Sequence, residues 1–471
     1  MSILIAGGGI GGLALALMLN EAGIKVRVFE KAASLGELGV GLNLLPHATA
    51  ELGRLGLLYR LDEIAVRTRQ LIYKTATGQD ILVQPRGLCA GLSHPQYSIH
   101  RGRLHSMLLQ ATRERLGKDH VIVDRTLVDF HQSPEGVRAQ FRSRDGAHFE
   151  ETGEILVGAD GIHSTVRDHF FPNQGPPHWN GVMMWRGATW APRFQGGDTM
   201  VIAGGMDRKL VIYPIAHDLA RPSEALTNWV VNVQIAEPGT PAPSRNDWSR
   251  QASVEEVLAQ AGDNLRIPGI DLEFLVRNAE GIFEYPMCDR AGLPRWSHGR
   301  VTMLGDAAHP MYPVGSNGAS QAIVDARTIG AAMLDHGVTP AALAIQQEMS
   351  AGAVCLSLVN ACLAAGSPDA LVLPLDVSDH EAMAAKTRAV VDHFGRIDLL
   401  VNNAGVATGG MLGETPLADW NWVLEINLMG VVRGCHHFVE RFRAQRFGHI
   451  VNVASFAGLA GAPGIASYGT A

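Results

Sequence analysis

The stretch "ILIAGGGIGGLALALML", residues 3–19, decides the fold. Four apolar residues predict a buried strand, the glycines that follow predict a tight turn, and the apolar run after them predicts a helix. The stretch is as apolar as a signal peptide, but no basic region precedes it, and five of the six residues from 7 to 12 are glycine. The strand "KVRVFE" at 25–30 completes a βαβ unit, which predicts a doubly wound α/β sheet.

Three of these glycines, Gly7, Gly9 and Gly12, fit the pattern G-x-G-x-x-G, and Glu30 ends the next strand. Glycines let a pyrophosphate approach the N–H groups at the positive end of the helix, while Glu30 can accept hydrogen bonds from an adenosine ribose. Glycines also serve tight turns and close packing alone. The strand, the helix and the acid favour dinucleotide binding, but the motif does not distinguish FAD from NAD.

The bulk composition points to a globular protein with small-molecule partners. At 471 residues and 46% hydrophobic content, the chain can form two or three domains with substantial cores. The net charge of −7 and the absence of a Lys/Arg run indicate no nucleic-acid or membrane surface. The five cysteines are scattered, and no other long apolar run suggests a membrane span, so a reducing cytoplasm is the expected location.

The pattern of strands and helices indicates two interleaved domains followed by a segment of different character. Buried strands alternate with helices in the first domain, whereas runs such as "GVMMWRGATW" and "TNWVVNVQI" predict a mostly antiparallel sheet in the second. The predicted limits are 1–70, 95–175 and 282–350 for the nucleotide-binding domain, 71–94 and 176–281 for the sheet domain, 351–366 for a junction, and 367–471 for an incomplete α/β segment.

Two further segments select the cofactor. The segments "GADGIHSTVR" (158–167) and "GRVTMLGDAAHPMYPVGSNGASQAIVDA" (299–326) resemble the second and third signatures of the flavin-dependent aromatic hydroxylases, the group of p-hydroxybenzoate and salicylate hydroxylases. The strings "PQYSIHRGRL", "MWRG", "NWV" and "YPMCDRAGLPRW" resemble the branch that contains 5-methylphenazine-1-carboxylate 1-monooxygenase. The likeness covers about residues 1–350.

The resemblance implies a reaction as well as a fold. NAD(P)H would reduce bound FAD, O₂ would add to form a C4a-hydroperoxide, and an oxygen would pass to an electron-rich aromatic ring. The protein must then supply a pocket that excludes water and polar groups that orient the ring. No protein nucleophile and no metal are required.

The same resemblance implies which residues bind FAD. Asp306, after Gly305 in the Gly-Asp motif, would accept a hydrogen bond from a ribityl hydroxyl. Alternatively, Asp306 only caps the next turn. Arg101 would bind the pyrophosphate or ribityl chain, or form a surface salt bridge. Asp160 lies in a segment that in this family is near the flavin and is linked to the handling of the nicotinamide cofactor. Alternatively, Asp160 only ties a turn. The loop before the helix at 318 would face the flavin pyrimidine edge with its N–H groups, and its candidate residues are Gly315, Asn317 and Gly318.

Candidates for the substrate pocket come from the inserted sheet and from the "GVGLNLLP" segment. Aromatic rings can stack on an aromatic substrate, an arginine can hold a carboxylate, and a histidine can act as a base or bind a phenol. Each residue alone is more typical of a structural role, since aromatic residues in sheets usually belong to the core and an arginine often pairs with an acid, so none is assigned to catalysis. These candidates are His47, Trp185, Arg186, Tyr213 and Tyr285.

Residues from about 367 onward resemble the short-chain dehydrogenase/reductase family. Motifs match in the family's order: "LDVSD" with Asp376, "NNAG" at 402–405, then Asn427, Ser455 and Tyr468. In that family Ser and Tyr polarise a carbonyl, and a lysine four residues after the Tyr lowers its pKa. The chain's last residue is Ala471, and "SNGASQAI" stands where the family's glycine-rich turn belongs. A free phenol has a pKa near 10, so we expect a vestigial site.

Three functions therefore compete at the level of sequence. The first is an FAD-dependent monooxygenase that hydroxylates an aromatic, including N-heteroaromatic or phenazine-type carboxylates. The second is a carbonyl reductase formed by the C-terminal segment. The third is a flavin-binding protein that does not hydroxylate productively. The sequence leaves open the substrate, the choice between NADH and NADPH, and the oligomeric state.

Overall fold

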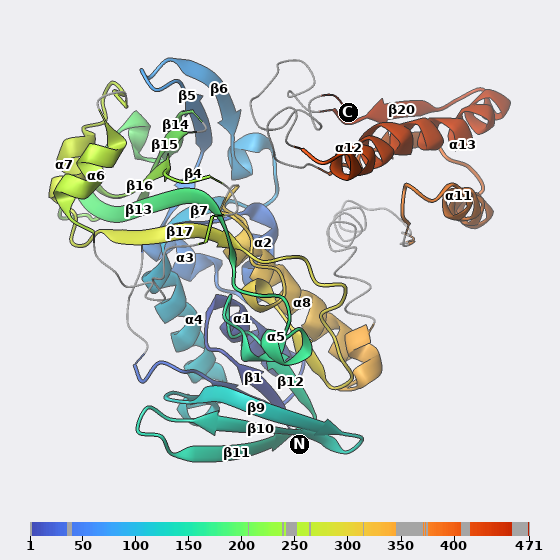
Figure 1. The fold of residues 1–471 in the computed structure, drawn as a ribbon, viewed down its shortest axis with the longest axis horizontal. Coiled ribbons are helices and arrows are strands. Elements are labelled where there is room, and N and C mark those ends of the chain that lie inside the picture. Colours follow the sequence, from blue (N-terminus) through green and yellow to red (C-terminus); the bar gives the residue numbers. More distant parts are fainter. Residues whose placement is uncertain are drawn as a thin grey trace. The chain divides into compact units, whose positions relative to one another are not determined.

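A computed structural model describes residues 2–34, 40–205, 207–237, 240–241, 252–262, 265–313, 315–344, 371, 373, 375–406, 415–454 and 470. The chain divides into two compact units, residues 1–353 and 354–471. The first unit contains the motifs of the flavin-dependent family, and the second contains those of the reductase family (Figure 1).

A five-stranded parallel sheet forms the base of the first unit, in the order β18-β12-β1-β2-β8. The strands are β1 (Ile3–Ala6), β2 (Val26–Phe29), β8 (Val121–Ile122), β12 (Ile155–Gly158) and β18 (Val301–Met303). Both faces are buried, as is usual for parallel sheets, so these strands consist of continuous apolar runs rather than alternating ones.

Helix α1 (Ile10–Glu21) packs with α4 (Arg101–Leu116) and α8 (Gly318–His336) beside this sheet (Figure 1). Every residue from Gly11 to Leu19 of α1 is buried, because the helix is enclosed by the sheet and its two neighbouring helices. This burial explains why the opening stretch is apolar on all sides of the helix.

A seven-stranded sheet forms the second layer system, in the order β17-β13-β16-β15-β14-β5-β6. The strands are β5 (Gln70–Lys74), β6 (Asp80–Pro85), β13 (His178–Pro192), β14 (Thr199–Gly204), β15 (Arg208–Ala216), β16 (Glu224–Gln234) and β17 (Phe283–Asp289). All neighbours are antiparallel except β14 and β5. Helices α6 (Val254–Ala261) and α7 (Leu272–Arg277) cover one face of this sheet (Figure 1).

Smaller elements complete the first unit. Two three-stranded antiparallel sheets consist of β9 (Thr126–Ser133), β10 (Gly136–Arg142) and β11 (His148–Gly153), and of β3 (Gly41–Leu44), β4 (Ala65–Thr68) and β7 (Gln96–His100). The short helices are α2 (Pro46–Arg54), α3 (Leu58–Ile64) and α5 (Thr165–Phe170), with 3₁₀ turns η1 (Gly87–Ala90), η2 (Lys118–His120), η3 (Gln195–Gly197) and η4 (Gly305–Ala307).

The second unit contains a two-stranded parallel sheet and helices. Its described elements are α11 (His380–Phe394), β19 (Leu399–Asn402), α12 (Leu417–Leu424), the π-helical turn η5 (Glu425–Met429), α13 (Gly430–Gln445) and β20 (His449–Asn452). The helices and strands expected after residue 379 are present. The strand expected in "SPDALVLPLDVSD" is absent at the described positions 371, 373, 375 and 376, and the rest of 367–374 lies outside the described residues.

The predicted α/β class, with an antiparallel sheet inserted into a Rossmann-type domain, is confirmed. One predicted limit needs correction. The segment from 282 was assigned to the nucleotide-binding domain, but β17 pairs with β13 and therefore extends the inserted sheet to Asp289. Within the described residues, no helix has both the length and the apolar character needed to cross a membrane.

The inserted sheet provides a test of its packing at Gly187. Trp229 is fully buried, and a Cβ at Gly187 would lie 2.3 Å from Cζ2 of its ring. We expect Gly187→Ala to lower the free energy of unfolding by about 1–3 kcal/mol, because the indole has no space to move into. Urea denaturation measures this change. Gly292→Ala is the control, since no atom lies within 4 Å of the added Cβ, and equal stability of the two variants would contradict the packing argument.

Candidate functional site: a flavin site at the edge of the parallel sheet

The polar candidates gather where the parallel strands end. Glu30 follows β2, Asp160 follows β12, and Asp306 follows β18, while the glycine turn follows β1. Because parallel strands present their carboxyl ends at one edge, residues far apart in the sequence meet there. This edge is also where open α/β sheets bind their ligands.

The three motif glycines have two different physical roles. Gly7 has φ +114°, and a Cβ on it would lie 2.1 Å from the Ala159 carbonyl oxygen. A Cβ on Gly12 would lie 2.1 Å from the Gly7 oxygen, so both residues are required by packing. Gly9, by contrast, has no atom within 4 Å of an added Cβ. Open space at Gly9, before the uncapped N-terminus of α1, fits a pyrophosphate.

Two side chains hold the peptide groups of Gly8 in this turn. The Gly8 N–H donates to Glu30 Oε2 at 2.8 Å, and His105 Nε2 donates to the Gly8 carbonyl at 2.7 Å. Glu30 Oε1 accepts a second hydrogen bond from the Ala32 N–H at 2.8 Å. Each carboxylate oxygen retains a lone pair for a ribose hydroxyl. His105, which sequence reasoning missed, comes from α4 and could only have been noted as the histidine in "RGRLHS".

Asp306 lies on the turn η4, next to the N-terminus of α8. A Cβ on Gly318 would lie 4.0 Å from Asp306 Oδ1, so the two elements adjoin. The carboxylate is accessible to solvent but is surrounded by protein, and this burial raises its pKa; the charges of His309 and Arg101 oppose the shift. The structure thus brings Arg101 and Asp306 into one electrostatic environment, as the motif resemblance implied.

The loop before α8 contains two consecutive residues with left-handed backbone conformation. Gly315 and Ser316 have φ +90° and +56°, and Asn317 at the helix N-cap makes no capping bond with its side chain. The Asn317 Oδ1 instead lies 3.1 Å from His47 Nε2. An amide oxygen only accepts, so His47 is the donor. Burial lowers the pKa of His47, which leaves a neutral ring with a basic Nδ1.

Asp160 has the contacts of a residue that ties a turn. Its Oδ2 accepts from the Thr165 N–H at 2.8 Å, at the beginning of α5. Its Oδ1 is buried and, within the described residues, has no hydrogen-bond partner. Burial is the main reason that the pKa of Asp160 is raised. The role of Asp160 in tying a turn therefore has contacts to support it.

Arg186 and Asn228 join the inserted sheet to the segment before α2. Arg186 Nη2 donates to the Gly41 carbonyl at 2.5 Å, and Asn228 Oδ1 accepts from the Gly41 N–H at 2.8 Å. Arg186 thus binds protein backbone and is not free to act as a carboxylate clamp alone. Tyr213 lies near Arg186. Burial raises the pKa of Tyr213, and Arg186 opposes this shift. Sequence patterns gave no sign of the role of Asn228.

Tyr285 lies at the meeting point of the two domains. It packs with Met184, Val230 and Met287, and Tyr312 from the flavin-loop side joins the same cluster. Burial raises its pKa, and the charges of Arg186 and Arg101 oppose this shift. An apolar, aromatic wall therefore faces the loop that leads into α8.

Trp185 lies elsewhere, contrary to the prediction that it could line the substrate pocket. It is 2% exposed and belongs to the core under α6 and α7, with Trp229. Because side chains alternate along β13, Trp185 and Arg186 point to opposite faces of the sheet. The ring is part of the core of the inserted domain.

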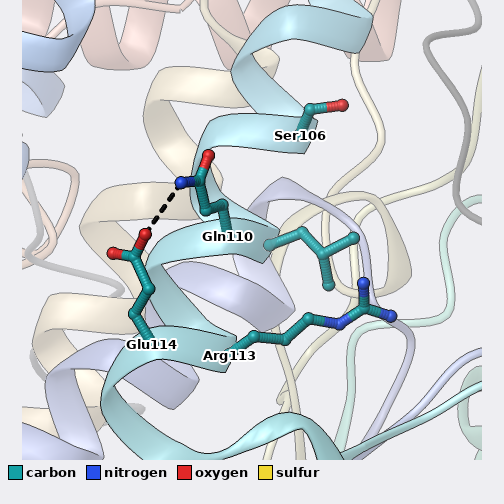
Figure 2. A pocket seen from close by; sticks show the side chains of 5 residues that line it. Ser106, Gln110, Arg113 and Glu114 are labelled. Carbon is teal, nitrogen blue, oxygen red and sulfur yellow. Dashed lines mark hydrogen bonds between the residues drawn. The ribbon is translucent and has the colours of Figure 1, made fainter.

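A hollow of about 330 Å³ on the surface of α4 is separate from these residues. Figure 2 shows Ser106, Gln110, Arg113 and Glu114 projecting from turns of this one helix, with Gln110 and Glu114 hydrogen-bonded at 2.8 Å. Glu114 also accepts from Arg60 Nη2 at 2.6 Å, and none of the cofactor candidates lines the hollow.

The described part of the second unit contains only some of the residues that match the reductase family's motifs. Asn427, on η5, accepts the Val406 N–H at 2.8 Å and donates to the Val406 carbonyl at 2.9 Å, so both polar atoms of its side chain are used within the fold. Ser455 and Tyr468 lie outside the described residues. Asp376 is exposed, and its bond from Ser378 lowers its pKa.

Comparison with known proteins identifies the family. The family model "FAD binding domain" matches residues 1–336. The chain belongs to the FAD-dependent aromatic hydroxylases. This monooxygenase is 42% identical over 347 residues to phenazine 1,6-dicarboxylic acid hydroxylase PhzS of Lysobacter antibioticus, with 72% of the chain and 84% of the relative covered. It is 32% identical to 3-hydroxybenzoate 6-hydroxylase 1 of Aquipseudomonas alcaligenes, covering 69% and 78%.

Solved structures show the same fold. Klebsiella pneumoniae HpxO complexed with FAD and uric acid aligns with a TM-score of 0.61 at 20% identity, covering 76% of this chain and 86% of that one. A salicylate hydroxylase substrate complex aligns with the same TM-score and coverage at 23% identity. The monooxygenase is an oxidoreductase that uses FAD, with NAD(P)H as co-substrate. A second model, "short chain dehydrogenase", matches residues 318–471 and so overlaps α8.

Gly9 allows the cofactor cradle to be tested without disturbing the fold. We expect Gly9→Ala to change the stability of the FAD-free protein by no more than about 1 kcal/mol, because its Cβ meets no protein atom. The same methyl group would occupy the proposed pyrophosphate space and raise the Kd for FAD by about tenfold or more. Flavin fluorescence titration and thermal melting measure the two effects.

Gly12→Ala is the contrasting variant, because its Cβ would collide with the Gly7 oxygen. It should lower the melting temperature of the FAD-free protein as well as FAD affinity. Unchanged FAD affinity in Gly9→Ala would place the pyrophosphate elsewhere.

Proposed function

We propose that this monooxygenase hydroxylates a fused, nitrogen-containing aromatic carboxylate of the phenazine type, with NAD(P)H and O₂. One observation carries the proposal: the Tyr285, Met184 and Tyr312 wall lies beside the clamped guanidinium of Arg186. A flat apolar surface next to a positive charge suits an aromatic ring bearing a carboxylate. The relative named as a phenazine dicarboxylic acid hydroxylase supports this substrate class.

We further propose how the chain holds FAD. Gly7, Gly9, Gly12 and Glu30 would bind the adenosine diphosphate half. Arg101 and Asp306, with Gly305, would bind the ribityl and pyrophosphate region, and Gly315, Asn317 and Gly318 would face the pyrimidine edge. The open space at Gly9 and the uncapped ends of α1 and α8 support the fit.

When bound, FAD supplies the redox chemistry and the activation of oxygen. The protein's own groups would orient the flavin and the substrate and protect them from water. The uncapped N-terminus of α8 favours negative charge at the flavin's pyrimidine edge. His47 donates to Asn317 and thereby fixes the loop, while its neutral Nδ1 can accept a proton from a ring hydroxyl. The Tyr285 wall excludes water from the space between sheet and loop.

The domain assignment is part of the proposal. Residues 1–70, 95–175 and the segment from 290 to about 350 would form the FAD-binding domain, and 71–94 with 176–289 the substrate domain. Residues 367–471 would contribute no reductase chemistry, because both polar atoms of Asn427 are used within the fold. In addition, "SNGASQAI" stands where the reductase family's glycine-rich turn belongs. The C-terminal site is then vestigial.

Aerobic turnover with a substrate panel tests the function. We expect phenazine-1-carboxylate to stimulate NAD(P)H oxidation and to yield hydroxylated product, whereas unsubstituted phenazine binds about tenfold more weakly for lack of the charged group. Chromatography quantifies product, and a peroxide assay quantifies uncoupled turnover. Oxidation that yields only peroxide with every aromatic would support the flavin-binding alternative instead.

Tyr468→Phe tests the reductase alternative in the same assay. We expect product formation and NAD(P)H consumption to remain within experimental error, because the hydroxylation requires no group from this segment. Ser455→Ala serves as the paired variant. A loss of aldehyde or ketone reduction in either variant, measured with a carbonyl panel, would show that the C-terminal segment is active.

A further inference from the structure

The turn that carries Asp306 is held by a side chain from α8. Gly305 has φ +56°, and its N–H donates to Asp325 Oδ2 at 2.8 Å. A Cβ on Gly305 would lie 3.0 Å from the Ala322 Cβ, so the turn also lies tightly against the helix. The position of Asp306 therefore depends on Asp325.

Asp325 is itself a buried carboxylate that needs a counter-charge. It is 1% exposed, and the oxygen that accepts the Gly305 N–H also accepts from His309 Nε2 at 2.5 Å. Since a carboxylate only accepts, Nε2 carries the hydrogen. Among the described residues, its other hydrogen-bond partner is the Gln321 amide, 3.4 Å from Oδ1. A buried carboxylate that lacks a charged partner takes up a proton, and the protonated oxygen then donates a hydrogen bond instead of only accepting one.

The His309 ring makes this one hydrogen bond and no other within the described residues, while its backbone N–H donates to the Gly305 carbonyl at 2.9 Å. Its Nδ1 is buried without a hydrogen-bond partner, and its ring centroid lies 4.7 Å from that of Trp296. The His309 ring and the Gly305 N–H thus donate to the same oxygen, Oδ2 of the Asp325 carboxylate.

The charges around His309 favour the imidazolium form. Burial alone lowers its pKa, but the hydrogen bond and charge of Asp325, together with the charge of Asp306, outweigh burial and raise it. Arg101 from α4 acts on Asp306 in the same environment. An imidazolium at this position offsets the negative charge of the buried Asp325 carboxylate, to which it donates.

We propose that His309 is a positioning residue for the flavin: it holds and compensates the buried carboxylate of Asp325, and Asp325 fixes the Gly305–Asp306 turn toward the ribityl chain. The inference rests on the proposed FAD contact of Asp306, but His309 and Asp325 act through the turn. Removing the imidazole leaves a buried carboxylate beside Asp306, which weakens the hold on Gly305 and lowers FAD affinity.

A double-mutant cycle on FAD affinity tests the coupling. Flavin fluorescence titration of the FAD-free full chain gives Kd for wild type, His309→Gln, Asp325→Asn and the double variant. We expect His309→Gln to raise Kd about tenfold in the wild-type background and less than about twofold in the Asp325→Asn background, where no buried charge needs compensation. An equal effect in both backgrounds, or no effect in either, overturns the proposal.

The pH dependence of FAD affinity is the second readout. Because the pKa of His309 is raised, the stabilising cation is present below that pKa and is lost as pH rises through it. Wild-type affinity should fall over this range, and the fall should be absent in His309→Gln. A purely steric role would leave the two pH profiles parallel, which also overturns the proposal. If His309→Gln does not fold, the wild-type profile alone decides, and an affinity that does not fall as pH rises overturns the proposal.

His336→Gln is the matched control, since His336 is exposed at the far end of the same helix. It should leave Kd and its pH profile unchanged. Thermal melting of each FAD-free variant separates loss of fold from loss of affinity. If wild type binds FAD and the His309 cycle shows no coupling, the inference fails while the proposed function stands. If wild type binds no FAD, the proposed function fails.

Discussion

The rest of the flavin site depends on how closely α1 approaches the parallel sheet. A side chain at Gly12 would collide with the Gly7 oxygen, and one at Gly7 would collide with Ala159. The glycines therefore set the position of the helix N-terminus at the edge where the five parallel strands end. Once that end is placed, Glu30 can hold the turn, and the pyrophosphate can be bound by N–H groups that have no side-chain cap.

Local patterns predicted this arrangement because its parts are close in sequence or carry a distinctive residue order. The strand, glycine turn and helix lie within the first 21 residues, and Asp306 directly follows a buried strand. The run "GVMMWRGATW" likewise predicted a strand of a mostly antiparallel sheet. Which face meets the cofactor domain depends on contacts distant in sequence, so Trp185 could not be assigned to the core under α6 in advance.

The contacts that sequence reasoning missed share one property. They join a side chain to a backbone group of a different element: His105 to Gly8, Asn228 to Gly41, and Arg167 to the carbonyls of Ala307 and Ala308. Backbone groups are the same at every residue, so no pattern of letters marks the acceptor. Only the folded chain shows that these side chains hold turns in place.

The η4 turn shows why such contacts matter for the flavin. On its N–H side lies the buried carboxylate of Asp325, and on its carbonyl side lies the guanidinium of Arg167, which has no solvent exposure. Burial lowers the pKa of Arg167 to about 10, so keeping this charge inside the protein is costly. Two buried charges of opposite sign around one short turn are hard to justify by stability. They are consistent with a need to hold Asp306 in one orientation, since a ribityl hydroxyl bond tolerates little displacement of its acceptor.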